Sequence, residues 1–136
     1  MTKKQILLIV DDDSDDREII RDAFMSNHKD HREYIHIENG IQLLEYLETE
    51  DNELPALIML DLNMPGKDGR EALKDIKNHE RFRHIPTIVF TTSASQKDRQ
   101  TSYELGANCF ITKPDTFNKL VELTTCITNI WLPENL

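Results

Sequence analysis

Several acidic side chains in this sequence directly follow apolar runs, at the points where strands would end. Asp11 and Asp12 come after the run from Gln5 to Val10, and Asp61 comes after the run from Leu57 to Leu60. Runs of this length and composition predict strands that are buried on both faces of a parallel sheet. Because the carboxyl ends of parallel strands open into the ligand crevice, we expect these carboxylates at one rim of the sheet.

Two further polar residues follow predicted strands in the second half of the chain. Thr91 comes after the apolar run 87–90, and Lys113 comes after the run 109–112. A lone aspartate such as Asp61 after one strand is more simply explained as a turn or helix-capping residue. A functional site is indicated because polar residues also follow the other predicted strands.

The residue types at these strand ends suit the transfer of a phosphoryl group. Close carboxylates repel one another by about 4 kcal/mol per pair at an effective dielectric near 20, so a cluster of three needs a cation. An all-oxygen set without His or Cys favours Mg²⁺, with Mn²⁺ as a second possibility. Lys113 adds a fixed positive charge and Thr91 a hydroxyl donor, which together can stabilise a phosphoryl group on a carboxylate nucleophile.

Length and charge limit the classes of protein to which the chain can belong. With 136 residues, of which 38% are hydrophobic, it has room for one domain with a substantial core. Twenty-five acidic against sixteen basic residues give a net charge of -9, which disfavours direct binding to nucleic acid or anionic lipid. No apolar run approaches the ~18–20 residues of a membrane span. We therefore expect a cytoplasmic protein.

The cysteines and histidines carry weaker signals. Cys109 falls in an apolar strand and Cys126 in an apolar helix, without CxxC spacing, so we expect free core thiols in a reducing cytosol rather than a disulfide. His28 and His31 lie three apart in a polar tract, and a metal site there would need a further ligand that the sequence does not offer nearby.

Strand and helix patterns alternate five times along the chain. The predicted strands are residues 5–10, 34–38, 57–60, 87–90 and 109–112, and helices follow each of them. Ser14 is the expected N-cap of the first helix, and Ser95 with Asp98 resembles a capping box for the fourth, which Gly106 ends. Residues 80–85 are expected to form a long basic loop. The alternation predicts an α/β fold, a doubly wound parallel sheet with right-handed crossovers and helices on both faces.

Four motifs in this order resemble the receiver domain of two-component response regulators. They are LLIVDD at 7–12, LDLNMPGKDG at 60–69, TTS at 91–93, and KP at 113–114 preceded by GA at 106–107. The TTS triplet, the loop at 79–85 and the last helix make the chain similar to single-domain regulators paired with phytochrome-type histidine kinases. The resemblance implies a flavodoxin-like five-stranded sheet of order 2-1-3-4-5. It also implies one receiver domain over 1–136, with a core of about 5–130 and no output domain.

The resemblance also implies how the strand-end residues share the work. Asp61 would accept a phosphoryl group from a phosphohistidine of a sensor histidine kinase. Mg²⁺ would be held by Asp12, by Asp61 and by the backbone carbonyl of Asn63, with Asp11 acting through a water. Lys113 would contact a phosphoryl oxygen. The chain would thus catalyse only its own phosphorylation and dephosphorylation, and would not be an enzyme in the usual sense.

A second group of residues is implied in switching and in tuning the phosphate lifetime. Thr91 would swing toward the phosphate, and the coupled aromatic position is Phe110, where many relatives have Tyr. Asn63 and Ser93 stand at positions that set the lifetime of the aspartyl phosphate in the family. Thr92 is bulkier than the Ala or Gly common at its place, which bears on the room near the phosphate.

Three other functions share parts of this pattern. A phosphatase of the haloacid dehalogenase type needs a second acid two residues after the nucleophile, where this chain has Asn63. A degenerate receiver would lack a site residue, and a flavin binder would have its phosphate repelled by the acids. If the receiver fills the chain, its signal must pass by protein contact, and we expect a homodimer through the last two helices and the fifth strand as one such contact.

Overall fold

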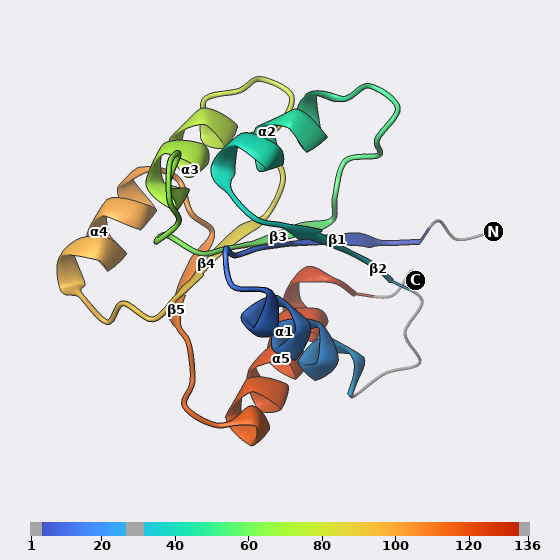
Figure 1. The fold of residues 1–136 in the computed structure, drawn as a ribbon, viewed down its shortest axis with the longest axis vertical. Coiled ribbons are helices and arrows are strands. Elements are labelled where there is room, and N and C mark those ends of the chain that lie inside the picture. Colours follow the sequence, from blue (N-terminus) through green and yellow to red (C-terminus); the bar gives the residue numbers. More distant parts are fainter. Residues whose placement is uncertain (1–3, 27–31, 134–136) are drawn as a thin grey trace.

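The computed structural model describes residues 4–26 and 32–133 as a five-stranded parallel sheet between two layers of helices (Figure 1). The strand order β2-β1-β3-β4-β5 confirms the predicted topology. The strands are β1 Ile6–Val10, β2 Glu33–Ile37, β3 Leu57–Leu60, β4 Thr87–Thr91 and β5 Cys109–Thr112. The helices are α1 Ser14–Met25, α2 Gly40–Glu48, α3 Gly69–Lys77, α4 Gln96–Glu104 and α5 Phe117–Trp131. His28 and His31, considered above as metal ligands, lie outside the described residues.

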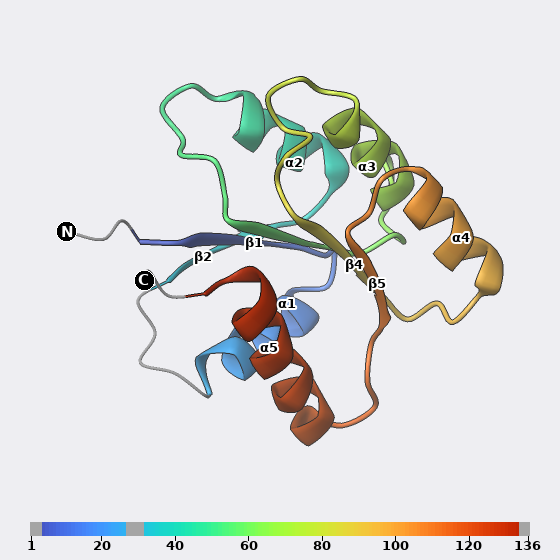
Figure 2. The ribbon, with the colours of Figure 1, turned by 180° about the vertical axis from the view of Figure 1, so that it is seen from behind.

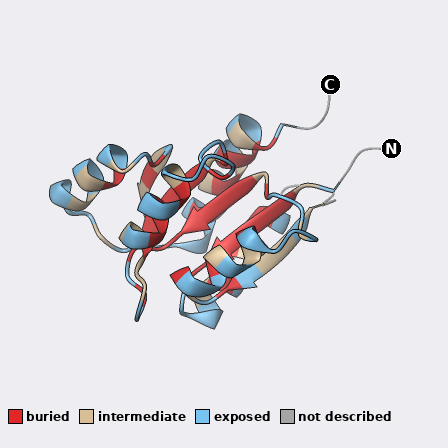
Figure 3. Ribbon diagram, turned by 90° about the horizontal axis from the view of Figure 1, so that it is seen from above, coloured by how far each residue is buried: buried red, intermediate tan, exposed pale blue. Residues whose placement is uncertain are grey.

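The two faces of the sheet have separate hydrophobic cores. Helices α1 and α5 cover one face, and α2, α3 and α4 lie on the other, as both views of the ribbon show (Figures 1 and 2). Alternate side chains of the central strands enter each core, so that Leu8 packs toward α2 and α3 while Ile9 packs toward α1 and α5. The central strands are buried on both sides (Figure 3), as their continuous apolar runs predict.

Strands β1 and β2 differ from the expected ranges by one residue at one or both ends, and two further boundaries differ next to the candidate site. The N-cap of α1 is Asp13 and not Ser14, because the Asp13 carboxylate accepts hydrogen bonds from the amides of Asp15 and Asp16. Strand β4 includes Thr91, because Thr91 pairs with Thr112 and its carbonyl accepts a 2.7 Å bond from the Lys113 amide. Thr91 is therefore held by the sheet rather than by a loop.

Two packing expectations were wrong. The segment 80–85 is not simply a basic loop, since Phe82 is 1% exposed and belongs to the core on the α2 and α3 face. His79 stacks on the Phe82 ring at 3.9 Å between centroids. Cys109 and Cys126 are both free, as expected, but Cys126 is exposed, because it lies on the outer side of α5. In the described part of the chain, none of the helices is long and apolar enough to cross a membrane.

Candidate phosphoryl-transfer site

The ends of four strands bring the predicted residues to one rim of the sheet. Asp11 and Asp61 extend the strands before them, since the Asp11 amide donates to the Ile37 carbonyl and the Asp61 amide to the Val10 carbonyl, each at 3.0 Å. The Lys113 amide is bonded in the same way to Thr91. Backbone ladder bonds thus fix the Cα positions of the nucleophile candidate and its neighbours before any side chain is placed.

Three carboxylates at this rim form a group that could hold a metal ion. Asp11, Asp12 and Asp61 each offer an oxygen atom, and these atoms lie within 4.8 Å of one another. Asp11 is 2% exposed and Asp61 is 7% exposed, whereas Asp12 is open to solvent. Two buried acids with an exposed third make a site that a hydrated divalent cation can enter, and oxygen donors are the ligands that Mg²⁺ and Mn²⁺ take.

The backbone after Asp61 folds back toward its carboxylate. The Asn63 amide donates to Asp61 Oδ1 at 3.4 Å, which places Asn63 beside the acid cluster. Its role as a carbonyl ligand of the metal stays a prediction.

Lys113 is the cation that partly neutralises this cluster. Its Nζ lies 2.7 Å from Asp11 Oδ2, 3.0 Å from Asp16 Oδ2 and 3.8 Å from Asp61 Oδ2. Burial by itself lowers the pKa of Lys113, but the hydrogen bonds to Asp11 and Asp16 outweigh it and bring the pKa to about 12. The ammonium group is therefore charged at neutral pH and stands within reach of a group bound to Asp61.

Lys113 only partly offsets the cost of burying the two carboxylates Asp11 and Asp61. Burial raises the pKa of Asp11 and of Asp61 above their ordinary value, and Lys113 opposes this only in part. The two carboxylates also act on each other, since Asp11 raises the pKa of Asp61. A further cation at the cluster would lower both pKa values, which is the physical reason to expect a metal there.

The structural roles of two neighbours of the acids were not predicted from the sequence. Asp16 was expected only to favour the start of α1, yet it holds Lys113. Arg17 is 8% exposed, and its Nη1 donates to the Asp11 carbonyl at 2.5 Å. Their place in the sequence could have indicated these roles. Both residues lie in the first turn of α1, which begins just after Asp11 and Asp12 and therefore lies near the same rim.

Gly69 is a further residue that the site requires. A Cβ atom built on Gly69 would lie 2.1 Å from the Asp61 carbonyl oxygen, so only glycine allows α3 to begin this close to the end of the strand that leads into Asp61. Asp68 caps the helix by accepting from the amides of Arg70 and Glu71. The Gly69 of the LDLNMPGKDG motif thus has a steric explanation.

The candidate switch residues are Thr91 on β4, beside Asp61, and Phe110 on β5. Thr91 is fully buried, and its side-chain hydrogen bond to Asp61 lowers the pKa of that carboxyl. The Ser93 amide donates to Thr91 Oγ1 at 3.3 Å. Phe110 is also buried, and the Arg99 guanidinium of α4 lies 5.0 Å from its ring centroid. Both candidate switch side chains therefore point inward.

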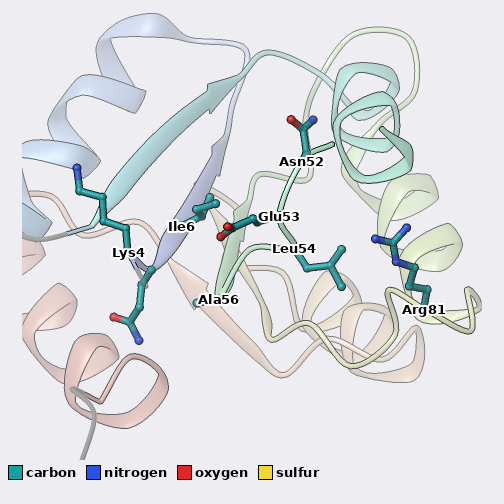
Figure 4. Close-up of a pocket in the computed structure, with 8 residues that line it drawn as sticks. Lys4, Ile6, Asn52, Glu53, Leu54, Ala56 and Arg81 are labelled. Carbon is teal, nitrogen blue, oxygen red and sulfur yellow. The ribbon is translucent and has the colours of Figure 1, made fainter. Parts of the chain in front are cut away.

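A hollow in the described surface adjoins the site, and a separate groove lies far from it. A hollow of about 270 Å³ between α1 and the start of α5 is lined by Asp16, Lys113 and the apolar side chains of Ile19 and Phe117, among others. A groove of about 440 Å³ lies at the opposite ends of β1 and β3, between Lys4, Glu53, Leu54 and Arg81 (Figure 4). The second groove shares no residue with the acid cluster.

Comparison with known proteins agrees with this geometry. The family model described as "Response regulator receiver domain" matches residues 7–125. Response regulator Rcp1 of Synechocystis is 36% identical over 132 residues, which cover 94% of this chain and 89% of Rcp1.

Two solved structures are similar over nearly their whole length. The phosphorylated cyanobacterial phytochrome response regulator RcpA superposes with a TM-score of 0.89 at 33% identity, covering 98% of both chains. The Mn²⁺-bound form of response regulator Rcp1 gives a TM-score of 0.85 at 33% identity, covering 97% of both chains.

Proposed function

This chain belongs to the response regulator receiver domain family and thus to the proteins of two-component signalling, and we propose that it accepts a phosphoryl group on Asp61 from a sensor histidine kinase. The observation that carries the proposal is the buried Asp61 carboxylate, which shares a metal-sized acid cluster and has Lys113 Nζ 3.8 Å from Oδ2. Such a carboxylate is both a nucleophile and a place where added negative charge can be stabilised.

In the proposed reaction, an Asp61 oxygen forms a bond to phosphorus while the bond from phosphorus to the imidazole nitrogen of the kinase breaks. Lys113 and the Thr91 hydroxyl bind phosphoryl oxygens. Mg²⁺, or Mn²⁺ in its place, would be held by Asp11, Asp12, Asp61 and the Asn63 carbonyl, and would offset charge on the transferring group.

The same residues account for the reverse half of the cycle. Attack of water on the aspartyl phosphate breaks the bond between phosphorus and Asp61 and releases inorganic phosphate. Receiver domains are signalling proteins rather than enzymes with a separate substrate, and we propose that this chain acts chemically only on its own Asp61. Asn63 and Ser93 are the residues that we expect to tune the lifetime of the phosphate, because they flank Asp61 and Thr91.

The hollow beside Lys113 is a candidate binding surface for the kinase. It adjoins the site, and the partly exposed Ile19 and Phe117 give it an apolar wall. An apolar surface next to Lys113 suits a helix that carries the phosphohistidine, and such a partner would meet the chain in the cytoplasm. The similarity to RcpA makes a phytochrome-type kinase the one that we favour.

Output through protein contact is the second part of the proposal. The net charge of -9 opposes direct contact with nucleic acid or an anionic membrane. We propose that phosphorylation shifts a pre-existing equilibrium at the face formed by α4, β5 and α5, which can also join two copies of the chain. Hydrogen exchange of residues 96–105 and 117–131 that is unchanged by a phosphoryl mimic would contradict this.

Intact-mass analysis after incubation with a small phosphodonor and Mg²⁺ tests the phosphoacceptor. We expect one added phosphoryl group on the native chain and none on Asp61→Asn. Asp51→Asn is the matched control, because it removes the same charge from an exposed position and should be labelled normally. Binding of beryllofluoride to the native chain separates rapid hydrolysis from a failure to react. Labelling of Asp61→Asn, or neither labelling nor beryllofluoride binding in the native chain, would overturn the assignment.

A further inference from the structure

A polar network joins the beginnings of α3 and α4 outside the acid cluster. Arg70 Nη2 lies 2.8 Å from Asp98 Oδ1, and the Ser93 hydroxyl donates to Asp98 Oδ2 at 2.7 Å. Asp98 is therefore bound at both oxygens, by a cation from α3 and by a hydroxyl from the segment between β4 and α4. We call these three residues the Arg70–Asp98–Ser93 network.

The position of Asp98 departs from the local capping pattern. Ser95 accepts a hydrogen bond from the Asp98 amide, which is the first half of the predicted capping box. The second half would have the Asp98 side chain accept from the Ser95 amide, but that amide donates to Ser93 Oγ at 3.2 Å instead. The carboxylate is thus directed away from its own helix end and toward Arg70 and Ser93.

Ser93 connects this network to the candidate switch residue. Its amide donates to Thr91 Oγ1, and its carbonyl accepts from Thr112 Oγ1 at 2.9 Å. Through these bonds the side chain, amide and carbonyl of Ser93 all have partners. A Ser93 held in this way fixes the backbone that follows Thr91 and therefore limits how far the Thr91 hydroxyl can leave Asp61.

Arg70 connects the network to the strand that carries the nucleophile. It is the second residue of α3, directly after Gly69, which lies against the Asp61 carbonyl. The other guanidinium nitrogen of Arg70, Nη1, lies 3.5 Å from Asp68 Oδ2. The guanidinium therefore ties the segment after Asp61 to the segment after Thr91.

Helix α4 is also attached to β5, through Arg99 and Tyr103 at Phe110, but apolar burial contributes little to its attachment. Ser102 is its only buried residue, and the remaining side chains are polar or exposed. The ion pair is partly exposed, so its effect is moderate and sensitive to salt.

We propose that the Arg70–Asp98–Ser93 network holds Thr91 over Asp61, so that Arg70 and Asp98 are positioning residues for the phosphorylated state. This inference rests on the proposed function of Asp61 and Thr91. The network touches neither the acids nor the expected phosphoryl group, and acts on them only through Ser93 and Thr91.

The test measures two affinities on the same variants. Mg²⁺ affinity reports the acid cluster, and beryllofluoride affinity at saturating Mg²⁺, followed by fluorine NMR, reports the site with Thr91 in place. Asp98→Asn and Arg70→Gln should weaken beryllofluoride binding by about threefold to tenfold, as expected for one partly exposed charged contact, and leave Mg²⁺ affinity unchanged. Glu104→Gln, which removes the same charge from the other end of α4, should change neither affinity.

A double-mutant cycle separates positioning from simple destabilisation. In a Thr91→Val background, Asp98→Asn should have no further effect on beryllofluoride affinity, because the hydroxyl that it positions is gone. An undiminished effect in that background, an equal loss of Mg²⁺ affinity, or no effect of Asp98→Asn in the native chain would overturn the inference. A native chain that binds no beryllofluoride and takes up no phosphoryl label would instead overturn the proposed function.

Discussion

Helices α4 and α5 precede and follow the same strand, β5, but different interactions hold them. Helix α5 buries Leu120, Thr124, Ile127 and Thr128, and packs against α1. Helix α4 buries only Ser102. Its side chains make polar contacts through the Asp98 network, through the Arg99 guanidinium over Phe110, and through a hydrogen bond from the Phe110 amide to the Tyr103 hydroxyl. One helix is held by apolar burial and the other mainly by polar contacts.

This difference bears on how a receiver can signal. Apolar burial stabilises in proportion to the area removed from water, so α5 cannot move away from α1 and the sheet without exposing a large apolar surface. Polar contacts are few and specific, and they can be exchanged for others at a small cost in free energy. We therefore expect a change at Asp61 to move α4 more readily than α5. The following predictions challenge this contrast, from the largest effect to the smallest.

Truncation of a buried α5 side chain should have the largest effect on stability. Ile127 is 3% exposed, and Ile127→Ala should lower the free energy of unfolding by about 2–4 kcal/mol, because it leaves a cavity in the core beneath α1. Ile130→Ala is the matched control, since Ile130 is 68% exposed and the change should cost little. Urea denaturation measures both, and equal values for the two variants would show that α5 is not held by burial.

The Tyr103 hydroxyl should account for part of the docking of α4. Tyr103→Phe leaves the Phe110 amide on the outer edge of β5 without its 3.0 Å acceptor, and should cost about 1–2 kcal/mol. Tyr46→Phe is the control, because the Tyr46 hydroxyl makes only a 3.5 Å contact with the Glu53 carbonyl. If Tyr103→Phe unfolds at the same urea concentration as the native chain, this contact does not hold the helix.

Ser102 offers a change of the opposite sign. Its hydroxyl is buried and has no hydrogen-bond partner within the described residues. Ser102→Ala should therefore stabilise the chain by about 0.5–1 kcal/mol, through removal of an unpaired polar group and a higher helix propensity. A lower midpoint in thermal unfolding for this variant would indicate that the hydroxyl is bonded in solution.

Acid should loosen α4 before α5. Arg70, and then Ser93, hold the pKa of Asp98 below its ordinary value of 3.8. A lowered pKa means that the contribution of the ion pair to stability is complete above about pH 3.8, and is lost as pH falls through the value in the folded state. Hydrogen exchange should show α4 amides losing protection over this range while α5 amides keep theirs. In Asp98→Asn this difference should vanish, and a loss in step for both helices would argue against separate modes of attachment.

Much of the fold could be predicted because the information was local in the sequence. The runs before Asp11 and Asp61 are continuous and apolar, which is the pattern of strands buried on both faces. Each run is followed by a segment whose apolar residues recur at helical spacing. Predicting the convergence of Asp11, Asp61 and Lys113 required only that the strands be parallel. Even the N-cap of α1 was missed by a single residue, since Asp13 and Ser14 are both good caps.

The errors concern partners distant along the chain. Phe82 was placed in a basic loop because its neighbours are charged, and only the packing of that loop against α3 buries it. Cys126 was placed in the core because α5 is apolar on more than one side, and the rotation of the helix against α1 decides which side faces outward.

The sequence by itself determined the order of elements, the residues at the strand ends and the chemistry that they can perform. These depend on residue type and on the spacing of apolar residues over short stretches, which can be read directly from the sequence. Only the tertiary structure decided that Asp16 shares Lys113 with Asp11, and that Asp98 joins Arg70 to Ser93. Lys113 and Asp16 are 97 positions apart in the sequence, and Arg70 and Asp98 are 28 positions apart. Whether such residues meet depends on how the helices pack around the sheet. No local pattern contains that geometry.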